Sequence, residues 1–237
     1  PPPPRRPGPG TPPQGRKPRT PTRAPVPSSC PPVQRRGVCL VISAPSGAGK
    51  STIANALRAS EPQLLHSVSV TTRQPRPGET DGVHYHFRTM ERFTQMAEAG
   101  ELLEWATVFG RGYGTPRAPV EQALAEGRDM VFDIDWQGHR QIRKALPDDV
   151  IGLFVLPPSI EELERRLHGR GSDEKEEIER RMQAARDEIS HWNEFDHVIV
   201  NADLDTAIAQ ARAVLVAARL ERHRQYGLAD LVTSFGV

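Results

Sequence analysis

The stretch Val38-Cys39-Leu40-Val41-Ile42-Ser43-Ala44-Pro45-Ser46-Gly47-Ala48-Gly49-Lys50-Ser51 decides the fold of this chain. Its first six residues are largely apolar and predict a buried strand, which runs into a loop of small residues that closes on Gly-Lys-Ser. The following segment, Thr52–Arg58, has helical spacing. A strand, a glycine-rich loop and a helix in this order form a pocket for polyphosphate, because successive backbone N–H groups and the helix N-terminus face the anion.

Two side chains of this loop have their own expected roles. Lys50 would reach the outer phosphates, and the Ser51 hydroxyl would ligate Mg²⁺. Ala44 stands where the pattern G-x-x-x-x-G-K-[ST] has its first glycine, so the motif requires that residue 44 does not adopt a positive φ. The alternative interpretation is a chance Gly-Lys-Ser beside a strand, and the order of strand, loop and helix argues against it.

The N-terminal part of the chain differs in composition from the rest. Net charge is +1 over 237 residues, but residues 1–36 hold 14 of the 23 prolines, eight basic residues and no acid. Such a segment buries too little apolar surface to offset the entropy of ordering, so we expect a disordered, proline- and arginine-rich tail. A solubilising extension is favoured over a segment that docks on a polyanion or a proline-binding domain, and its partner stays unknown.

The remaining sequence predicts one α/β fold. Strand patterns at Val38–Ser43, Leu65–Val70, 130–133, Ile151–Leu156 and His197–Val200 alternate with helical patterns at Arg117–Glu126, Trp136–Ala145, Ser159–His168, Asp173–Phe195 and Asp203–Arg224. This order is typical of a five-stranded parallel sheet flanked by helices, as in phosphate-loop nucleotide-binding proteins. Residues 71–115 break the alternation and predict an inserted mixed α+β subdomain, with short strand pieces and a helix near Glu91–Ala99.

Targeting signals and cysteines add little. We find no apolar run long enough for a secretory signal or a membrane span, and the prolines of the tail exclude an amphipathic presequence helix. Two cysteines make neither a disulfide framework nor a metal set. We therefore expect a cytoplasmic location and no membrane partner.

Acidic and basic residues outside the loop suggest the rest of a site. Asp133 ends an apolar strand, which is the position of the acid beside Mg²⁺ in phosphate-loop enzymes. Asp135 suits a functional role and the N-cap of the following helix equally well. Arg73 and Arg76 lie three residues apart on a proline-stiffened segment and form a fork suited to a second phosphate group. Glu104, at the mouth of an apolar strand, could accept two hydrogen bonds from the adjacent N–H and N–H₂ donors of guanine.

From about residue 37 to 225 the chain resembles the guanylate kinases, which transfer the γ-phosphoryl group of ATP to GMP. The resemblance rests on separated motifs: Ser-Ala-Pro-Ser-Gly-Ala-Gly-Lys-Ser at 43–51, Thr-Thr-Arg-Gln-Pro-Arg-Pro-Gly-Glu at 71–79, and Arg-Arg-Leu-His-Gly-Arg-Gly at 165–171 followed by Arg180-Arg181. The family's loop also admits alanine at the position of Ala44. The resemblance implies a core at 37–70, 116–165 and 187–237, a GMP-binding subdomain at 71–115 and a helical lid at 166–186.

The resemblance also assigns site residues. ATP would be bound by the loop residues Ala44, Pro45, Ser46, Gly47, Ala48, Gly49, Lys50, Ser51 and Thr52. The GMP phosphate would be held by Arg73, Arg76, Tyr85 and Tyr113, and the guanine would be read by Ser69, Glu104, Thr115 and Asp133. Lys50, Arg166, Arg170 and Arg181 would act on the transferring group. Mg²⁺ would be held by Ser51 and Asp133, directly or through water.

The substrates predict a mechanism without a strong general base. A phosphate monoester is largely ionised at neutral pH, so catalysis would rest on alignment and on charge neutralisation by Lys50, Mg²⁺ and the lid arginines. We expect ATP and GMP as substrates, with dGMP as a further acceptor, and no specific nucleic-acid partner. Two alternatives stay open: a non-catalytic guanylate-kinase-like module that binds phosphopeptides, and a kinase for another small phosphorylated acceptor.

Overall fold

The structure, a computed structural model, describes residues 34–168 and 175–236. Its main sheet has five strands in the order β2-β7-β1-β8-β9, all paired in parallel. The strands are β1 (Cys39–Ser43), β2 (Leu64–His66), β7 (Asp129–Asp133), β8 (Val150–Leu156) and β9 (His197–Val200). The predicted five-stranded parallel sheet with flanking helices is therefore confirmed, and the apolar strand that opens the chain's motif lies at its centre.

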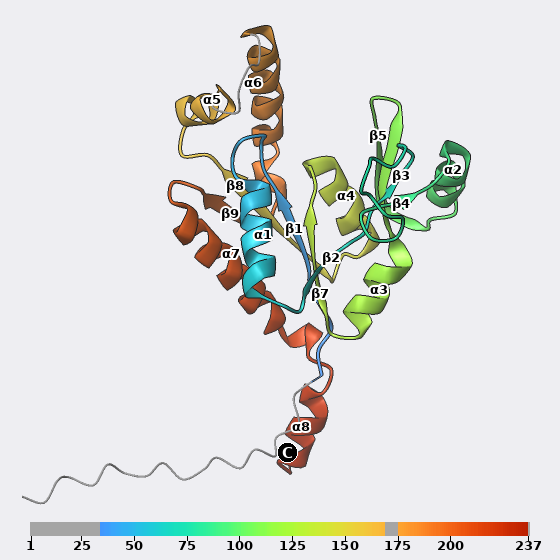
Figure 1. The fold of residues 1–237 in the computed structure, drawn as a ribbon. Coiled ribbons are helices and arrows are strands. Elements are labelled where there is room, and N and C mark those ends of the chain that lie inside the picture. Colours follow the sequence, from blue (N-terminus) through green and yellow to red (C-terminus); the bar gives the residue numbers. More distant parts are fainter. Residues whose placement is uncertain (1–33, 169–174, 237) are drawn as a thin grey trace, which may run out of the picture. The chain divides into compact units, whose positions relative to one another are not determined.

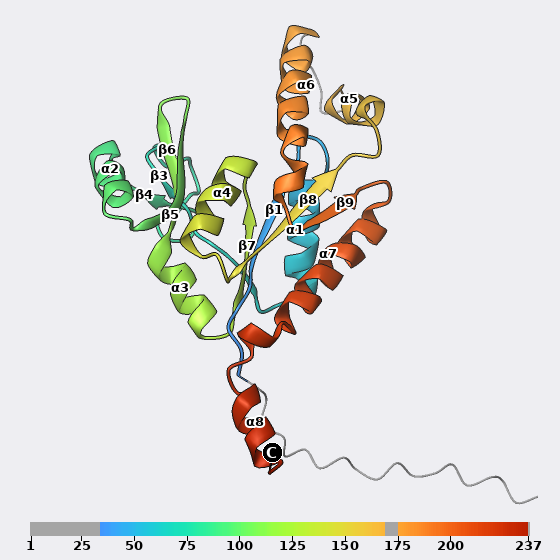
Figure 2. The ribbon, with the colours of Figure 1, turned by 180° about the vertical axis from the view of Figure 1, so that it is seen from behind.

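Helices cover both faces of this sheet. α1 (Lys50–Ser60) and α7 (Leu204–Arg219) lie together on one side, and α3 (Arg117–Ala125) and α4 (Trp136–Ala145) lie on the other (Figures 1 and 2). The alternation of β1 serves both sides: Leu40 and Ile42 belong to the core under α1 and α7, and Cys39 and Val41 belong to the core under α3 and α4. Because both faces are buried, the strand is a continuous apolar run.

A second, smaller sheet is inserted between β2 and α3. Its strands, in the order β4-β3-β6-β5, are β3 (Val70–Thr71), β4 (His86–Phe87), β5 (Leu102–Val108) and β6 (Arg111–Pro116), and α2 (Met90–Glu98) packs against them. Phe93 of α2 is buried against this sheet, and a Cβ on Gly112 would lie 2.6 Å from its ring. The mixed pairing of this sheet separates it from the parallel core.

Several boundaries differ from those predicted. The single strand predicted over Leu65–Val70 is wrong, because the chain leaves the main sheet after His66 and enters the small sheet at Val70. A period-2 pattern cannot show such a change of sheet. The helix predicted to reach Phe195 ends at Ser190, and the short helix η1 (Trp192–Glu194) follows it.

Near the C-terminus, the helix predicted over Asp203–Arg224 is shorter. α7 ends at Arg219 and is followed by the 3₁₀ helix η2 (Arg222–Arg224). Strand β6 and helix α8 (Leu228–Ser234) were not predicted.

Two arginines assigned to the tail are tied to the core. Arg35 forms a two-pronged ion pair with the buried carboxylate of Asp129, with N···O distances of 2.7 and 2.9 Å. Arg36 pairs in the same way with Asp149 at 2.6 and 2.7 Å. The average composition of residues 1–36 hid these contacts, because an arginine that pairs with a distant acid looks the same in sequence as a solvated one.

Helices α5 (Ile160–His168) and α6 (Lys175–Ser190) form the last unit relevant to the site. Leu163 and Leu167 of α5 pack with Met182 and Ala185 of α6 in a small apolar cluster of their own. In Figure 1 this helix pair and the small sheet both lie toward the end of the main sheet at which α1 begins. Of the helices in the described ranges, none has the length and apolar character needed to cross a bilayer.

Candidate active site

The loop between β1 and α1 surrounds a cavity of about 240 Å³. Gly47 and Gly49 have positive φ values of 92° and 103°, which explains glycine at both positions. Phe109 is the one non-glycine residue with positive φ in the described ranges, so Ala44 meets the condition that the sequence set for it. The loop therefore has the backbone that a phosphate cradle requires.

Asn201 supports this loop from β9. Its side-chain amide donates to the carbonyl of Ala48 at 2.8 Å, and it is buried. A Cβ on Gly49 would lie 2.5 Å from that amide nitrogen, so the close approach requires glycine. Asn201 was not predicted as a site residue. A polar residue directly after the carboxyl end of a parallel strand lies at the ligand-binding edge of the sheet, which is the signal that could have identified it.

Asp133 contacts two residues that line the cavity, Lys50 and Ser51. The ammonium of Lys50 lies 2.9 Å from the Asp133 carboxylate, and the Ser51 hydroxyl donates to the same carboxylate at 2.6 Å. The side chains of Lys50 and Asp133 are partly exposed, and Ser51 is exposed. The structure thus places Asp133 against the phosphate loop, and Asp135 accepts from the Gly138 N–H at 2.8 Å as the cap of α4.

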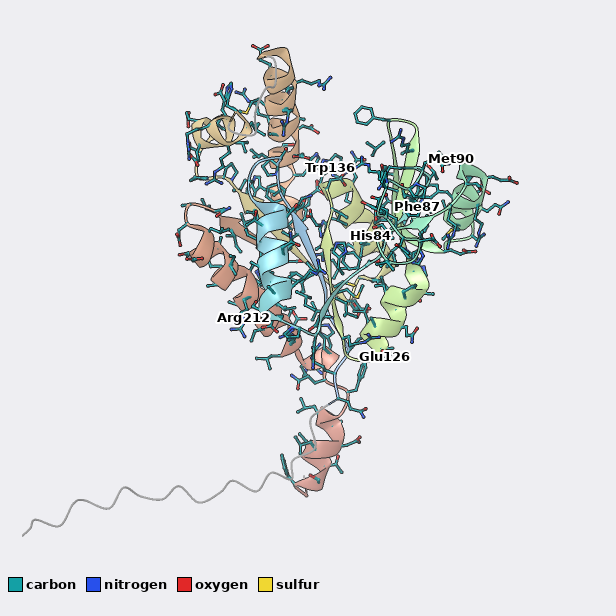
Figure 3. All side chains as sticks on the ribbon, in the orientation of Figure 1. His84, Phe87, Met90, Glu126, Trp136 and Arg212 are labelled. Carbon is teal, nitrogen blue, oxygen red and sulfur yellow. The ribbon has the colours of Figure 1, made fainter. Side chains whose placement is uncertain are left out.

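Arg73 is held in place in the loop that follows β3 of the small sheet. It is buried, and its guanidinium forms a two-pronged pair with Glu79 at 2.6 and 2.7 Å. The same guanidinium lies 5.0 Å from the centre of the Tyr85 ring and 5.7 Å from that of Phe87, which is labelled in Figure 3. Hydrogen bonds from the Arg73 guanidinium and from the Arg76 backbone N–H lower the pKa of Glu79 to about 2.

The other predicted GMP-phosphate residues lie nearby. The backbone N–H of Arg76 donates to Glu79 at 2.7 Å, so Glu79 organises both arginines of the predicted fork. Tyr113 of β6 pairs with Thr71 across the small sheet. Both Tyr85 and Tyr113 lie close enough to Arg73 to influence it electrostatically. The structure therefore brings together residues that the sequence spreads over about forty positions.

Glu104 and Thr115 form the other predicted pair of the small sheet. They are directly opposite each other on β5 and β6, and the Thr115 hydroxyl donates to the Glu104 carboxylate at 2.8 Å. Burial raises the pKa of Glu104 more than this hydrogen bond lowers it. Ser69 precedes β3, and its carbonyl accepts the His86 N–H at 2.8 Å. A half-buried acceptor beside a hydroxyl is suited to a ligand with adjacent N–H donors.

A side-chain amide joins the small sheet to the core. Gln141 of α4 accepts from the Trp105 N–H and donates to the Trp105 carbonyl, both at 3.0 Å. These two hydrogen bonds attach the free edge of β5 to α4 at Trp105, the residue that follows Glu104. Gln141 was not predicted, because no local pattern distinguishes it from any other polar residue on an exposed helix face.

The predicted lid arginines are described in part. Arg166 of α5 pairs with Glu162 at 2.7 Å and donates to the Asn201 carbonyl at 3.3 Å. Arg181 of α6 donates to the Ser46 hydroxyl of the phosphate loop at 3.3 Å. Arg170 lies outside the described residues. Both described arginines therefore contact the loop or the residue that supports it.

α6 also supplies an acid that the sequence did not single out. The carboxylate of Glu188 accepts the Ser46 N–H at 3.1 Å, and the side chain lines the phosphate-loop cavity. At its C-terminal end α6 is followed by His191, which stacks on Trp136 of α4 with 3.6 Å between ring centres (Trp136 is labelled in Figure 3). The helix is thus fixed to the core at one end and contacts the loop through Arg181 and Glu188.

The central parallel strand, the glycine loop and the Lys50–Ser51–Asp133 cluster define a phosphate-loop nucleotide-binding protein. The profile of the guanylate kinase family matches residues 36–218 of this chain. Guanylate kinase of Gluconobacter oxydans is 77% identical over 201 residues, which cover 85% of this chain and 97% of the relative. Guanylate kinase of Granulibacter bethesdensis is 59% identical over 203 residues, with 86% and 95% covered.

A solved structure agrees with these sequence matches. The crystal structure of guanylate kinase from Anaplasma phagocytophilum is 37% identical, with a TM-score of 0.67, and the match covers 85% of this chain and 96% of that one. The chain therefore belongs to the guanylate kinase family, and the resemblance stated from its motifs is confirmed.

Proposed function

We propose that this protein transfers the γ-phosphoryl group of ATP to GMP and releases ADP and GDP. Family membership supports this activity. The observation that carries it is the pairing of two features on one small sheet: the half-buried Glu104–Thr115 acceptor and the Arg73 fork. The first suits the donor edge of guanine, and the second suits a monoester phosphate.

The donor nucleotide would occupy the phosphate loop at residues 44–52. The backbone N–H groups of the loop and the N-terminus of α1 would bind the phosphates, and Lys50 would neutralise the charge of the outer phosphates. Arg166, Arg170 and Arg181 of the proposed lid at 166–186 would add positive charge to the transferring group. The acceptor would bind in the proposed subdomain at 71–115, with Arg73, Arg76, Tyr85 and Tyr113 on its phosphate and Ser69, Glu104 and Thr115 on its base.

The residues present fit a magnesium ion. Ser51 and Asp133 offer hard oxygen donors within hydrogen-bonding distance of each other at the loop, and Mg²⁺ prefers oxygen ligands completed by phosphates and water. Ser51 would hold the ion directly and Asp133 directly or through water. When bound, Mg²⁺ supplies charge neutralisation at the phosphates. Asp133 contacts Lys50 and Ser51, which favours this role over its other expected role in reading guanine.

The reaction needs alignment more than proton transfer. An oxygen of the ionised GMP phosphate forms the new bond to the γ-phosphorus while the bond to the β–γ bridging oxygen breaks, and ADP leaves with that oxygen. No side chain has to take a proton, because the acceptor phosphate is ionised near neutral pH. Arg73 would hold the attacking group in line, and its rigid pairing with Glu79 and Tyr85 supports that role.

A coupled transfer assay tests the proposal. The full chain is supplied with ATP and Mg²⁺ and, in turn, GMP, dGMP, AMP, UMP or CMP, and ADP formation is followed. We expect GMP to be the preferred acceptor and dGMP to be used, with the other three near background. Preference for AMP or a pyrimidine nucleotide would contradict the Glu104–Thr115 assignment, and no transfer to any acceptor would contradict the proposed activity.

A further inference from the structure

Glu188 places a carboxylate in a cavity built for anions. It reaches the phosphate-loop cavity from α6, and its Oε2 accepts the backbone N–H of Ser46 at 3.1 Å. The N–H groups of such a loop are the donors that bind nucleotide phosphates. The chain's own carboxylate therefore uses a donor that a triphosphate would also use.

The charged groups around Glu188 act on its carboxylate in opposite directions. Lys50 in the same cavity attracts the carboxylate, whereas Asp135 at the start of α4 and Asp187 on α6 repel it. The side chain is half-buried, and burial raises the pKa of Glu188 more than the Ser46 hydrogen bond lowers it. The Ser46 contact and Lys50 therefore favour the charged carboxylate, while burial and two neighbouring acids oppose it.

The same helix approaches Ser46 with the opposite charge. Arg181 lies seven residues before Glu188, which is about two helical turns and so the same side of α6. Its guanidinium donates to the Ser46 hydroxyl at 3.3 Å, while Glu188 accepts the Ser46 N–H. An arriving triphosphate would repel Glu188 and attract Arg181. α6 would then lose its contact through Glu188 and gain one between Arg181 and the ligand.

We propose that Glu188 is a built-in competitor for the phosphate loop, which the donor triphosphate must displace, and that it lowers the affinity of the free protein for that ligand. The inference rests on the proposed role of the loop as the donor site. It makes Glu188 an affinity-determining residue of that site. It also links the position of α6 to occupancy of the loop, because the contact that the ligand breaks is the one between Ser46 and α6.

Isothermal titration calorimetry of the 237-residue chain tests this directly. MgATP and inorganic tripolyphosphate are titrated into the wild type, Glu188→Gln and Asp187→Asn. Glu188→Gln keeps a carbonyl that can accept the Ser46 N–H and removes the charge, and Asp187→Asn removes the same charge from the exposed neighbouring position. We expect Glu188→Gln to bind both ligands about fivefold to tenfold tighter, since charge-assisted hydrogen bonds are roughly twice as strong as neutral ones. Asp187→Asn should stay within about twofold of wild type.

The outcomes are distinguishable. Equal or weaker binding by Glu188→Gln, or an equal gain in Asp187→Asn, would overturn the inference. A wild type that binds tripolyphosphate but not MgATP would contradict the proposed donor site, and the Glu188 comparison would then be read from tripolyphosphate. If Glu188→Gln does not fold, the backbone amide resonance of Ser46 in the wild type decides. The chemical shift of this amide should change with pH as Glu188 gains or loses its proton, and excess tripolyphosphate should abolish that change. A chemical shift that does not follow pH, or that follows it equally in excess tripolyphosphate, would overturn the inference.

Discussion

The phosphate loop and the small sheet are built in different ways. The loop is one continuous stretch of chain between β1 and α1, and its geometry follows from glycines at 47 and 49 and from one supporting contact to Asn201. The small sheet and its connecting loops assemble their polar residues from segments far apart in sequence, and two of the predicted site side chains there have a side-chain partner: Glu79 for Arg73 and Thr115 for Glu104. A site of the first kind depends on backbone, and a site of the second kind depends on side-chain pairs.

The largest effect is expected from Lys50→Ala. In the proposed donor site, loss of the ammonium would leave the outer phosphates without their main neutralising side chain, so turnover should fall about 100-fold to 1,000-fold. The protein should still fold, because Lys50 is at the rim of the site and its partner Asp133 keeps solvent access. Steady-state rates with saturating ATP and GMP provide the measurement. Lys144→Ala, at an exposed position in the last turn of α4, is the matched control and should keep wild-type turnover.

Glu104→Gln should weaken GMP binding and stabilise the free protein at the same time. One acceptor proposed to face the guanine edge would become a donor, so the KM for GMP should rise roughly tenfold to 100-fold while the KM for ATP changes little. Because burial raises the pKa of Glu104, the folded chain holds this proton more tightly than the unfolded chain. The ionised carboxylate therefore costs stability, and this cost appears as pH rises through the ordinary pKa of about 4.3 and the raised folded value.

Thermal unfolding checks the second half of that prediction. Glu104→Gln should melt above the wild type at pH 8, and the difference should shrink toward pH 4. Glu98→Gln, an exposed position at the end of α2, should not change the melting temperature. A lower melting temperature for Glu104→Gln at pH 8 would mean that the carboxylate stabilises the fold and is not held there for a ligand.

Asn201→Ala should have an intermediate effect on the donor side. Removing the amide leaves the Ala48 carbonyl without its buried donor, at a cost of about 1–3 kcal/mol in unfolding free energy. A less well supported loop should raise the KM for ATP about threefold to tenfold and leave the KM for GMP unchanged. Denaturant unfolding and initial rates are the measurements, with the exposed Asn193→Ala as control. Wild-type ATP kinetics in Asn201→Ala would show that the loop does not need this support.

The smallest effect is expected from deletion of residues 1–32. This segment is rich in proline and arginine, and the truncated chain keeps Arg35 and Arg36, whose partners Asp129 and Asp149 lie in the core. Specific activity should stay within about twofold of the full chain, and unfolding midpoints should coincide. A large loss of activity would mean that the tail takes part in the reaction.

The contrast between the two regions also explains what the sequence could predict. The loop, its strand and α1 follow from a contiguous pattern, because strand, glycine and helix signals stand side by side. The small sheet is harder, because its strands β3 and β4 have two residues each and leave no periodic signal. The change of sheet after His66 was missed for the same reason.

Contacts that depend on tertiary structure were missed more consistently. Gln141 and Glu188 are polar residues on helices, and only the packed chain shows that one meets the edge of β5 and the other meets Ser46. Arg35 was averaged into the tail although it pairs with a buried acid 94 positions away. Charge and periodicity report what a segment can do by itself, and these residues act through partners that the segment does not contain.

The central claim is that the two regions bind different ligands, and calorimetric dissociation constants for MgATP and GMP in three proteins test it most directly. The dissociation constants of both ligands are measured in Lys50→Ala and Glu104→Gln and are compared with those of the wild type. We predict that Lys50→Ala weakens MgATP and leaves GMP within about twofold, and that Glu104→Gln weakens GMP and leaves MgATP within about twofold. Equal loss of both ligands in either variant would contradict the separation of donor loop and acceptor sheet.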